Sequence, residues 1–171
     1  RLENPMVEYH RVGYNAGPAG AARIGLKQLA EEGYQWIYWG DDDNPPPISD
    51  TFEKLVRLGD NLIAKKIRVG AIGATGRFFN KWKGKLIRLK DKQLVSEIIV
   101  DSIPANAFIV NADVVKNGIL PDDRLFFGFE ELDFCFQMKS HGYRLYCHGQ
   151  LLRQFRSLYN RGDILESPII K

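Results

Sequence analysis

Three adjacent carboxylates, Asp41-Asp42-Asp43, are the side chains of this sequence best suited to chemistry. They directly follow the apolar run 36–39, which predicts a buried strand. Neighbouring carboxylates repel one another unless a positive charge lies between them. Mg²⁺ or Mn²⁺ suits such oxygen ligands, and a site with few protein ligands leaves coordination positions for substrate phosphates. The alternative is a solvated acidic turn that begins the next helix, and both interpretations fit the triplet taken alone.

A second acidic cluster consists of Glu130, Glu131 and Asp133, directly after the aromatic segment 126–129. Aromatic neighbours would desolvate a carboxylate, raise its pKa and make it a useful general base. The alternative is the ordinary preference of acidic side chains for the first turn of a helix. Two clusters with different neighbours suggest that one binds metal and the other handles a proton.

The elements that must position these clusters can be predicted from apolar spacing. A glycine-rich loop at 13–20 precedes a helix at 19–32, which Gly33 would end, and a strand at 35–40 follows. This order is typical of a parallel α/β sheet. The helix start would accept an anion, with Arg23 as a nearby donor. Further expected elements are a helix capped by Asp50 and Glu53, strands at 69–74, 98–103 and 107–110, a turn at 82–86, and a helix from 130 to 142.

Length and composition predict one domain over residues 1–171, because 44% hydrophobic residues with 12% aromatics can build a core. The net charge is only +3 and the basic residues look scattered, so we expect no nucleic-acid partner. Cys135 and Cys147 lie in apolar sequence and are expected to be reduced core thiols. No stretch approaches the ~20 apolar residues of a membrane span. We expect a cytoplasmic protein, either free or peripheral to the inner face of the membrane.

Three separated stretches together resemble family-2 glycosyltransferases of GT-A fold. They are Tyr14–Gly25 with its Asn-Ala-Gly loop, Trp36–Asp43 with the triple Asp, and Leu125–Cys135 with Phe-Glu-Glu-Leu-Asp. The triple Asp is similar to the rhamnosyl- and galactofuranosyl-transferase-like subset. The resemblance implies an α/β GT-A fold, Rossmann-like, with a mostly parallel sheet flanked by helices.

The resemblance also implies roles for the donor side of the reaction. Asp41 and Asp43 would hold the divalent metal and, through it, the diphosphate of a nucleotide-sugar donor. Asp42 would contact the ribose or the sugar of that donor, and Asn15 and Arg23 resemble further donor contacts. The metal would act as a Lewis acid on the departing nucleoside diphosphate.

On the acceptor side, Glu131 occupies the position of the presumed base. It would take a proton from a hydroxyl of a glycan or lipid-linked acceptor during a single inverting displacement. The family usually has Asp there, so Glu130 or Asp133 would contribute if the longer side chain does not reach.

Two departures from the family pattern lead to further expectations. His148 is displaced from the place of a metal-binding histidine, so a structural role is favoured, and Arg153 or Arg156 would serve the diphosphate instead. The first strand, helix and strand of the family have no counterpart here. We therefore expect an N-terminally incomplete domain, a fragment or a short form, whose sheet edge is covered by a preceding segment or an oligomer.

Two other functions stay open at this stage. A nucleotidyltransferase also uses an acidic metal site on a similar sheet. A non-catalytic metal-binding or carbohydrate-binding module would use Asp41 to Asp43 without turnover, although the ligand alternation of an EF-hand is absent.

Overall fold

The computed structural model describes residues 8–40, 45–104 and 107–159. The predicted metal and donor ligands Asp41, Asp42 and Asp43 lie outside these described residues. Among the described residues the chain is an α/β fold with one mixed five-stranded sheet and a separate two-stranded hairpin.

The main sheet has the strand order β1-β6-β2-β7-β5. Its strands are β1 (Trp36–Trp39), β2 (Val69–Gly73), β5 (Glu97–Val100), β6 (Phe108–Asn111) and β7 (Arg144–His148). β6 runs antiparallel to both β1 and β2, and β5 runs antiparallel to β7. β2 and β7 form the one parallel pair of this sheet in the described part of the chain.

Strands were predicted where β1, β2, β5 and β6 lie, but β7 was not predicted, and the prediction of a mostly parallel sheet is wrong. β1 and β2 do run in the same direction, as a strand–helix–strand unit predicts. The sequence-distant strand β6 lies between them in the opposite direction, with Ile37 opposite Val110 and Ile72 opposite Ile109. A pairing between such distant segments cannot be read from local periodicity.

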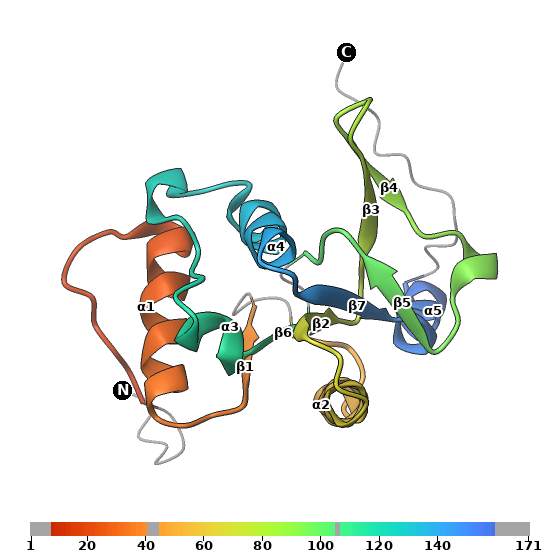
Figure 1. Ribbon diagram of the computed structural model, residues 1–171, viewed down its shortest axis with the longest axis horizontal. Helices are drawn as coiled ribbons and strands as arrows, with labels where there is room; N and C mark the ends of the chain where they lie inside the picture. The colour runs from red at the N-terminus through yellow and green to blue at the C-terminus, as the bar shows by residue number, and fades with distance from the viewer. Residues whose placement is uncertain (1–7, 41–44, 105–106, 160–171) are drawn as a thin grey trace.

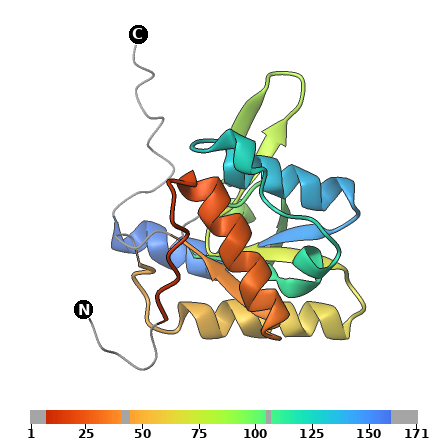
Figure 2. The same ribbon diagram turned by 90° about the vertical axis from the view of Figure 1, so that its left-hand side faces the viewer.

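Helices cover both faces of the sheet (Figures 1 and 2). One face carries α1 (Gly17–Glu31), α3 (Ala112–Lys116) and α4 (Glu130–Ser140), and the other carries α2 (Thr51–Ala64) and α5 (Gly149–Leu158). Two short 3-10 turns, η1 (Asp91–Gln93) and η2 (Asp123–Leu125), lie in connections. Each face has its own apolar core, with Phe134 and Met138 on the α4 side and Leu55 and Leu151 on the α2 side.

The first two long helices differ in how far local signals explain their ends. Gly33 adopts a φ of +96° just after α1, as the predicted helix end requires. The predicted cap of α2 is wrong, because Asp50 makes no capping hydrogen bond and Glu53 pairs with Arg57 one turn later. The two carboxylates of that start are therefore engaged along the helix surface.

β1 is an edge strand among the described residues, and the prediction of a buried strand holds for Ile37 alone. Ile37 is buried, whereas Tyr38 is 38% exposed. Trp36 lies over α2, where its indole N–H donates to Asp60 at 3.0 Å and a Cβ at Gly59 would collide with its ring. Side chains on both faces of β1 therefore hold the strand in place, while its outer edge is not covered by another strand of the described chain.

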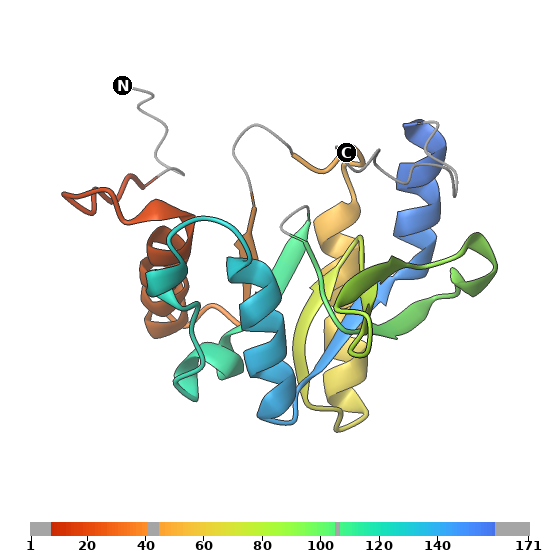
Figure 3. The same cartoon turned by 90° about the horizontal axis from the view of Figure 1, so that it is seen from above.

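A hairpin of β3 (Arg77–Asn80) and β4 (Lys85–Arg88) projects from the body, and the turn predicted at 82–86 overlaps the link between its strands (Figures 1 and 3).

None of the helices in the described part of the chain combines the length and apolar character needed to cross a bilayer.

Candidate functional site

The segments that carry the three motifs meet at one end of the sheet. The Trp39 ring at the end of β1 lies 5.9 Å from the Phe134 ring of α4 and 5.8 Å from the Phe108 ring of β6, measured between centroids. Ala19 at the start of α1 donates its N–H to the Phe126 carbonyl at 3.3 Å. The glycine loop, the strand that leads to residue 41 and the first turn of α4 are thus neighbours.

The start of α1 is closely fitted to the aromatic segment 126–129. Gly17 has a φ of +64°, and a Cβ there would collide with the Phe126 carbonyl oxygen. Asn15 Oδ1 accepts from the Gly17 N–H at 3.2 Å. Because the Gly17 and Ala19 amides already have internal acceptors, an anion at this helix start would have to displace them.

Arg23 and Asp133, both predicted site residues, line one open polar depression of about 510 Å³. Arg23 lies almost two turns beyond the start of α1, and its Nη1 donates to the Pro121 carbonyl at 3.0 Å. The other charged side chains of the depression are Asp122, Asp123 and Arg124. Since carboxylates outnumber guanidinium groups, the depression suits a hydroxyl-rich or cationic group better than a diphosphate.

An exposed ion pair forms the rim of this depression. The Arg124 guanidinium bonds both carboxylate oxygens of Asp122, at 2.8 Å from Nε and 2.6 Å from Nη2. These bonds lower the pKa of Asp122 to about 2. Asp122 therefore stays ionised, and Arg124 keeps a fixed partner.

The three predicted carboxylates of α4 lie in different surroundings. Glu130 is only 5% exposed, and its Oε2 has no hydrogen-bond partner among the described residues. Asp133 accepts a hydrogen bond from the Gln137 Nε2 at 2.6 Å and faces the polar depression. Glu130 and Asp133 were expected to lie together, but one is buried and the other borders solvent.

Glu131 lies on yet another side of α4. It is one turn before Cys135, whose Sγ accepts from the Ile103 N–H at 3.4 Å. Residues four apart share a helix face, so Glu131 lies on the side of α4 that meets the Ile103 segment. Residues two apart differ by about 200°, which puts Glu131 and Asp133 on opposite sides. In the described part of the chain, no three His, Cys, Asp or Glu side chains group closely enough to hold a metal.

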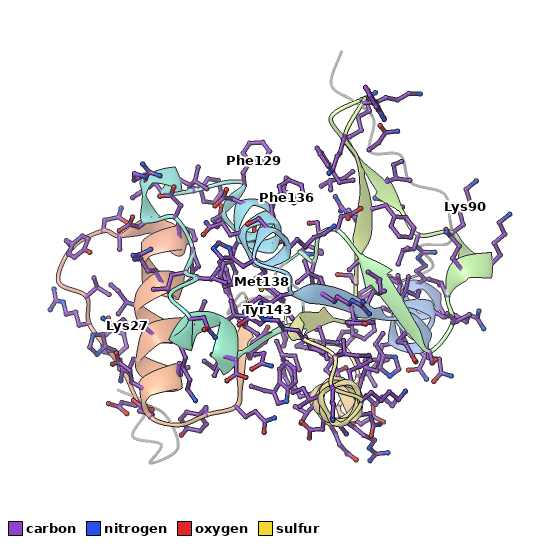
Figure 4. The ribbon with its side chains drawn as sticks, viewed as in Figure 1. Lys27, Lys90, Phe129, Phe136, Met138 and Tyr143 are labelled. Carbon is purple, nitrogen blue, oxygen red and sulfur yellow. The ribbon has the colours of Figure 1, made fainter. Side chains whose placement is uncertain are left out.

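The aromatic side chains before α4 do not form the desolvating pocket that the sequence suggested. Phe127 and Phe129 are 77% and 76% exposed, and Phe129 stands out beyond the start of α4 (Figure 4). Phe126 and Phe129 both have positive φ, at +54° and +67°, which is strained for bulky residues. The exposed rings of Phe127 and Phe129 do not cover Glu130, so its burial comes from the core instead.

His148, Arg153 and Arg156 have structural partners. His148 Nδ1 accepts from the Leu151 N–H at 3.3 Å and caps α5, as the favoured structural interpretation requires. Burial lowers the pKa of this half-buried histidine. The Arg153 and Arg156 guanidinium groups donate to backbone carbonyls of the segment before β5, at 2.9 and 2.6 Å. A diphosphate would have to compete with these bonds.

The two cysteines are free and buried, as predicted, and burial raises the pKa of each thiol to about 12. They are therefore inert core side chains.

An apolar groove of about 300 Å³ follows the outer edge of β1 beneath α1. Small residues of α1, Ala21, Ala22 and Gly25, form one wall, and Tyr38 and Gly40 form part of the other. Gly40 directly precedes Asp41, so the groove borders the predicted metal ligands in sequence.

No known family model matches this chain, and no curated protein matches it either. Sequence reasoning did not single out Gln137 or the Asp122–Arg124 pair, although the spacing of Asp133 and Gln137 by four residues was a usable signal.

Proposed function

We propose that this chain is a metal-dependent, inverting glycosyltransferase domain of family 2 with a GT-A fold. It would move a sugar from a nucleotide-diphosphate sugar to a hydroxyl of a glycan or lipid-linked acceptor, on the cytoplasmic side of the membrane. The observation that carries the proposal is the meeting of three separated motif segments at one sheet end, through the Trp39–Phe134 and Ala19–Phe126 contacts. Such a meeting is what a shared site requires.

We propose that a divalent cation binds at this end of the sheet, where the described residues offer one unpaired carboxylate oxygen. A buried carboxylate oxygen without a partner is costly, and a cation or a water molecule would relieve that cost. Glu130 Oε2 is such an oxygen, in the turn that follows the Phe126–Ala19 contact. We assign Asp41 and Asp43 as ligands, with Mg²⁺ or Mn²⁺ supplying Lewis-acid stabilisation of the leaving diphosphate.

The apolar groove beside β1 suits the flat base of the donor nucleoside. Its walls are mostly alanine, glycine and aliphatic side chains, and its volume is at the low end for ligand pockets. With the base in this groove, the ribose and diphosphate would lie toward Gly40, which directly precedes the Asp triplet in sequence. We assign Asp42 the contact with the ribose or the sugar.

We assign Glu131 as the base, because it occupies the position that the family resemblance gives to the base. The acceptor hydroxyl would give its proton to Glu131 while its oxygen bonds to the anomeric carbon. The bond from that carbon to the diphosphate oxygen breaks in the same step, which inverts the configuration. Asp133 is the rival base, on the opposite side of the helix beside Gln137.

The test compares three variants for sugar transfer and for binding of UDP- and dTDP-sugars with Mn²⁺ or Mg²⁺. Asp43→Ala should abolish metal-dependent binding and transfer. Glu131→Gln should keep donor binding, seen as an unchanged thermal shift, and lower turnover by about 10²–10⁴-fold. Asp133→Asn is the matched control in the same helix turn and should keep turnover. Loss of turnover in Asp133→Asn alone would move the base to Asp133, and full activity of Asp43→Ala would exclude the metal site.

A further inference from the structure

The β3–β4 hairpin is the most basic feature of the molecule. Its residues, 77–88, include five basic side chains and no acidic one, whereas the whole chain has a net charge of +3. The prediction that basic residues are scattered is therefore wrong for this segment. Three of the five gather at the tip, in the sequence Lys81-Trp82-Lys83-Gly84-Lys85.

Trp82 at this tip is completely exposed, at 100% of its surface. A fully exposed indole offers its whole apolar surface and its N–H to a binding partner. All three tip lysines are exposed as well, and none of them has an ion-pair partner in the described part of the chain. The tip thus offers an aromatic ring between positive charges, of which Lys81 has an electrostatic interaction with Asp101.

This exposure is built into the fold and does not come from a loose loop. The turn is fixed by a hydrogen bond from the Lys83 N–H to Asn80 Oδ1 at 3.0 Å and by Gly84 at a φ of +58°. At the base, the Phe79 N–H donates to Asp101 Oδ2 at 2.7 Å, and the Phe79 ring lies 5.0 Å from the Phe136 ring of α4. Asp101 is itself paired with Lys139. The hairpin is held at both ends while its tip stays in solvent.

We propose that the hairpin tip docks on the surface of an anionic lipid bilayer. Trp82 would enter the interfacial layer, where amphipathic indole rings are favoured, and Lys81, Lys83 and Lys85 would contact lipid phosphates. A convex tip with one aromatic ring fits a flat, deformable surface. Single-stranded nucleic acid is instead bound in grooves that carry several stacking rings, whereas Trp82 is the one aromatic residue of the tip 81–85. Figure 3 views the molecule from the side toward which the hairpin points.

The proposal is independent of the proposed transferase activity, since it concerns a surface away from the carboxylates of α4. Docking of the hairpin tip would also explain physically how the chain reaches the peripheral membrane location that the sequence led us to expect. Each lysine near an anionic membrane adds to the attraction, and the effect weakens with salt.

The test is co-sedimentation of the whole chain with vesicles of phosphatidylcholine alone or of phosphatidylcholine with phosphatidylglycerol at about 3:1. We expect binding to the anionic vesicles only, weakened by salt. The variant Lys81→Gln/Lys83→Gln/Lys85→Gln should bind on the order of a hundredfold more weakly. Trp82→Ser should also bind more weakly at unchanged charge.

The matched control removes the same charge elsewhere, through Lys27→Gln/Lys65→Gln/Lys116→Gln. Lys27 lies on α1 at the far end of the molecule from the hairpin (Figure 4), and all three lysines are exposed. The control should bind nearly as well as the original chain. Equal losses in both triple variants, no binding to anionic vesicles, or tighter hairpin-dependent binding to poly-uridine RNA than to vesicles would each overturn the proposal.

Discussion

The first turn of α4 and the tip of the β3–β4 hairpin depart from ordinary protein architecture in opposite directions. The turn buries Glu130 with a carboxylate oxygen that has no partner among the described residues, whereas the tip leaves Trp82 wholly in water. An unpaired buried carboxylate oxygen lowers stability, whereas a fully exposed indole contributes almost nothing to it. Stability alone therefore does not explain either region. A ligand at each of them would supply the contact that the described residues lack.

The same helix connects the two places. Phe134 of α4 packs on Trp39 at the sheet end, and Phe136, two residues later, packs on Phe79 of the hairpin. Two aromatic contacts from opposite sides of one helix therefore hold the proposed site and the proposed docking surface in fixed relation.

The largest effect should come from a pair of aromatic truncations that contrasts the two regions. Phe134 is fully buried, so Phe134→Ala should lower the free energy of unfolding by about 3–5 kcal/mol. Trp82→Ala removes an equally large ring from water and should change it by less than about 0.5 kcal/mol. Urea unfolding followed by circular dichroism measures both. A cost for Trp82→Ala close to that of Phe134→Ala would show that the hairpin tip is packed in solution.

An intermediate effect is expected where the buried carboxylate is removed. Glu130→Met keeps the side-chain length and removes the unpaired oxygen, so in EDTA it should raise the free energy of unfolding by about 1–3 kcal/mol. Added Mg²⁺ or Mn²⁺ should stabilise the original chain more than the variant. Glu53→Met is the control, because Glu53 is an exposed acidic residue in the first turn of α2. Lower stability of Glu130→Met in EDTA would mean that Glu130 has a partner after all.

The smallest effect concerns a buried polar group that does have its partner. His148 caps α5 through a neutral Nδ1, and its pKa is lowered by burial below its usual value near 6.5. Because the unfolded chain binds the proton more readily, the stability contributed by neutral His148 is present above that value and is lost as the pH falls below it.

His148→Asn keeps a capping oxygen and removes the titration. Its melting temperature should therefore fall less than that of the original chain between pH 7 and pH 5. His10→Gln, at an exposed position, is the control and should follow the original chain. If His148→Asn also followed the original chain, another group would account for the loss in acid.

Local signals in the sequence were enough to place most of the elements. Apolar spacing with Gly33 located α1, and the turn residues around Gly84 located the hairpin. Strand direction was not predictable, because it depends on where β6 inserts between β1 and β2. That choice is made by contacts between residues far apart in sequence, and periodicity carries no information about it.

The candidate site was predictable as residue types and less so as geometry. Glu130, Glu131 and Asp133 were expected as one cluster beneath aromatic rings, yet the helix turns them to different surroundings, and the rings of Phe127 and Phe129 are exposed. The strain at Phe126 and Phe129 has no local sequence signal, because these bulky residues rarely adopt such angles. The basic hairpin tip was visible as Lys-Trp-Lys, but its projection from the body depends on tertiary contacts.

The Phe79–Phe136 contact, with ring centroids 5.0 Å apart, would affect which acceptor the proposed transferase can use. With the hairpin tip resting on a bilayer, this contact sets the height of the α4 carboxylates above the lipid surface. α4 would then hold its carboxylates at a fixed distance from the membrane. The hydroxyl of a membrane-anchored acceptor would be reached only when its lipid carrier holds it at that distance.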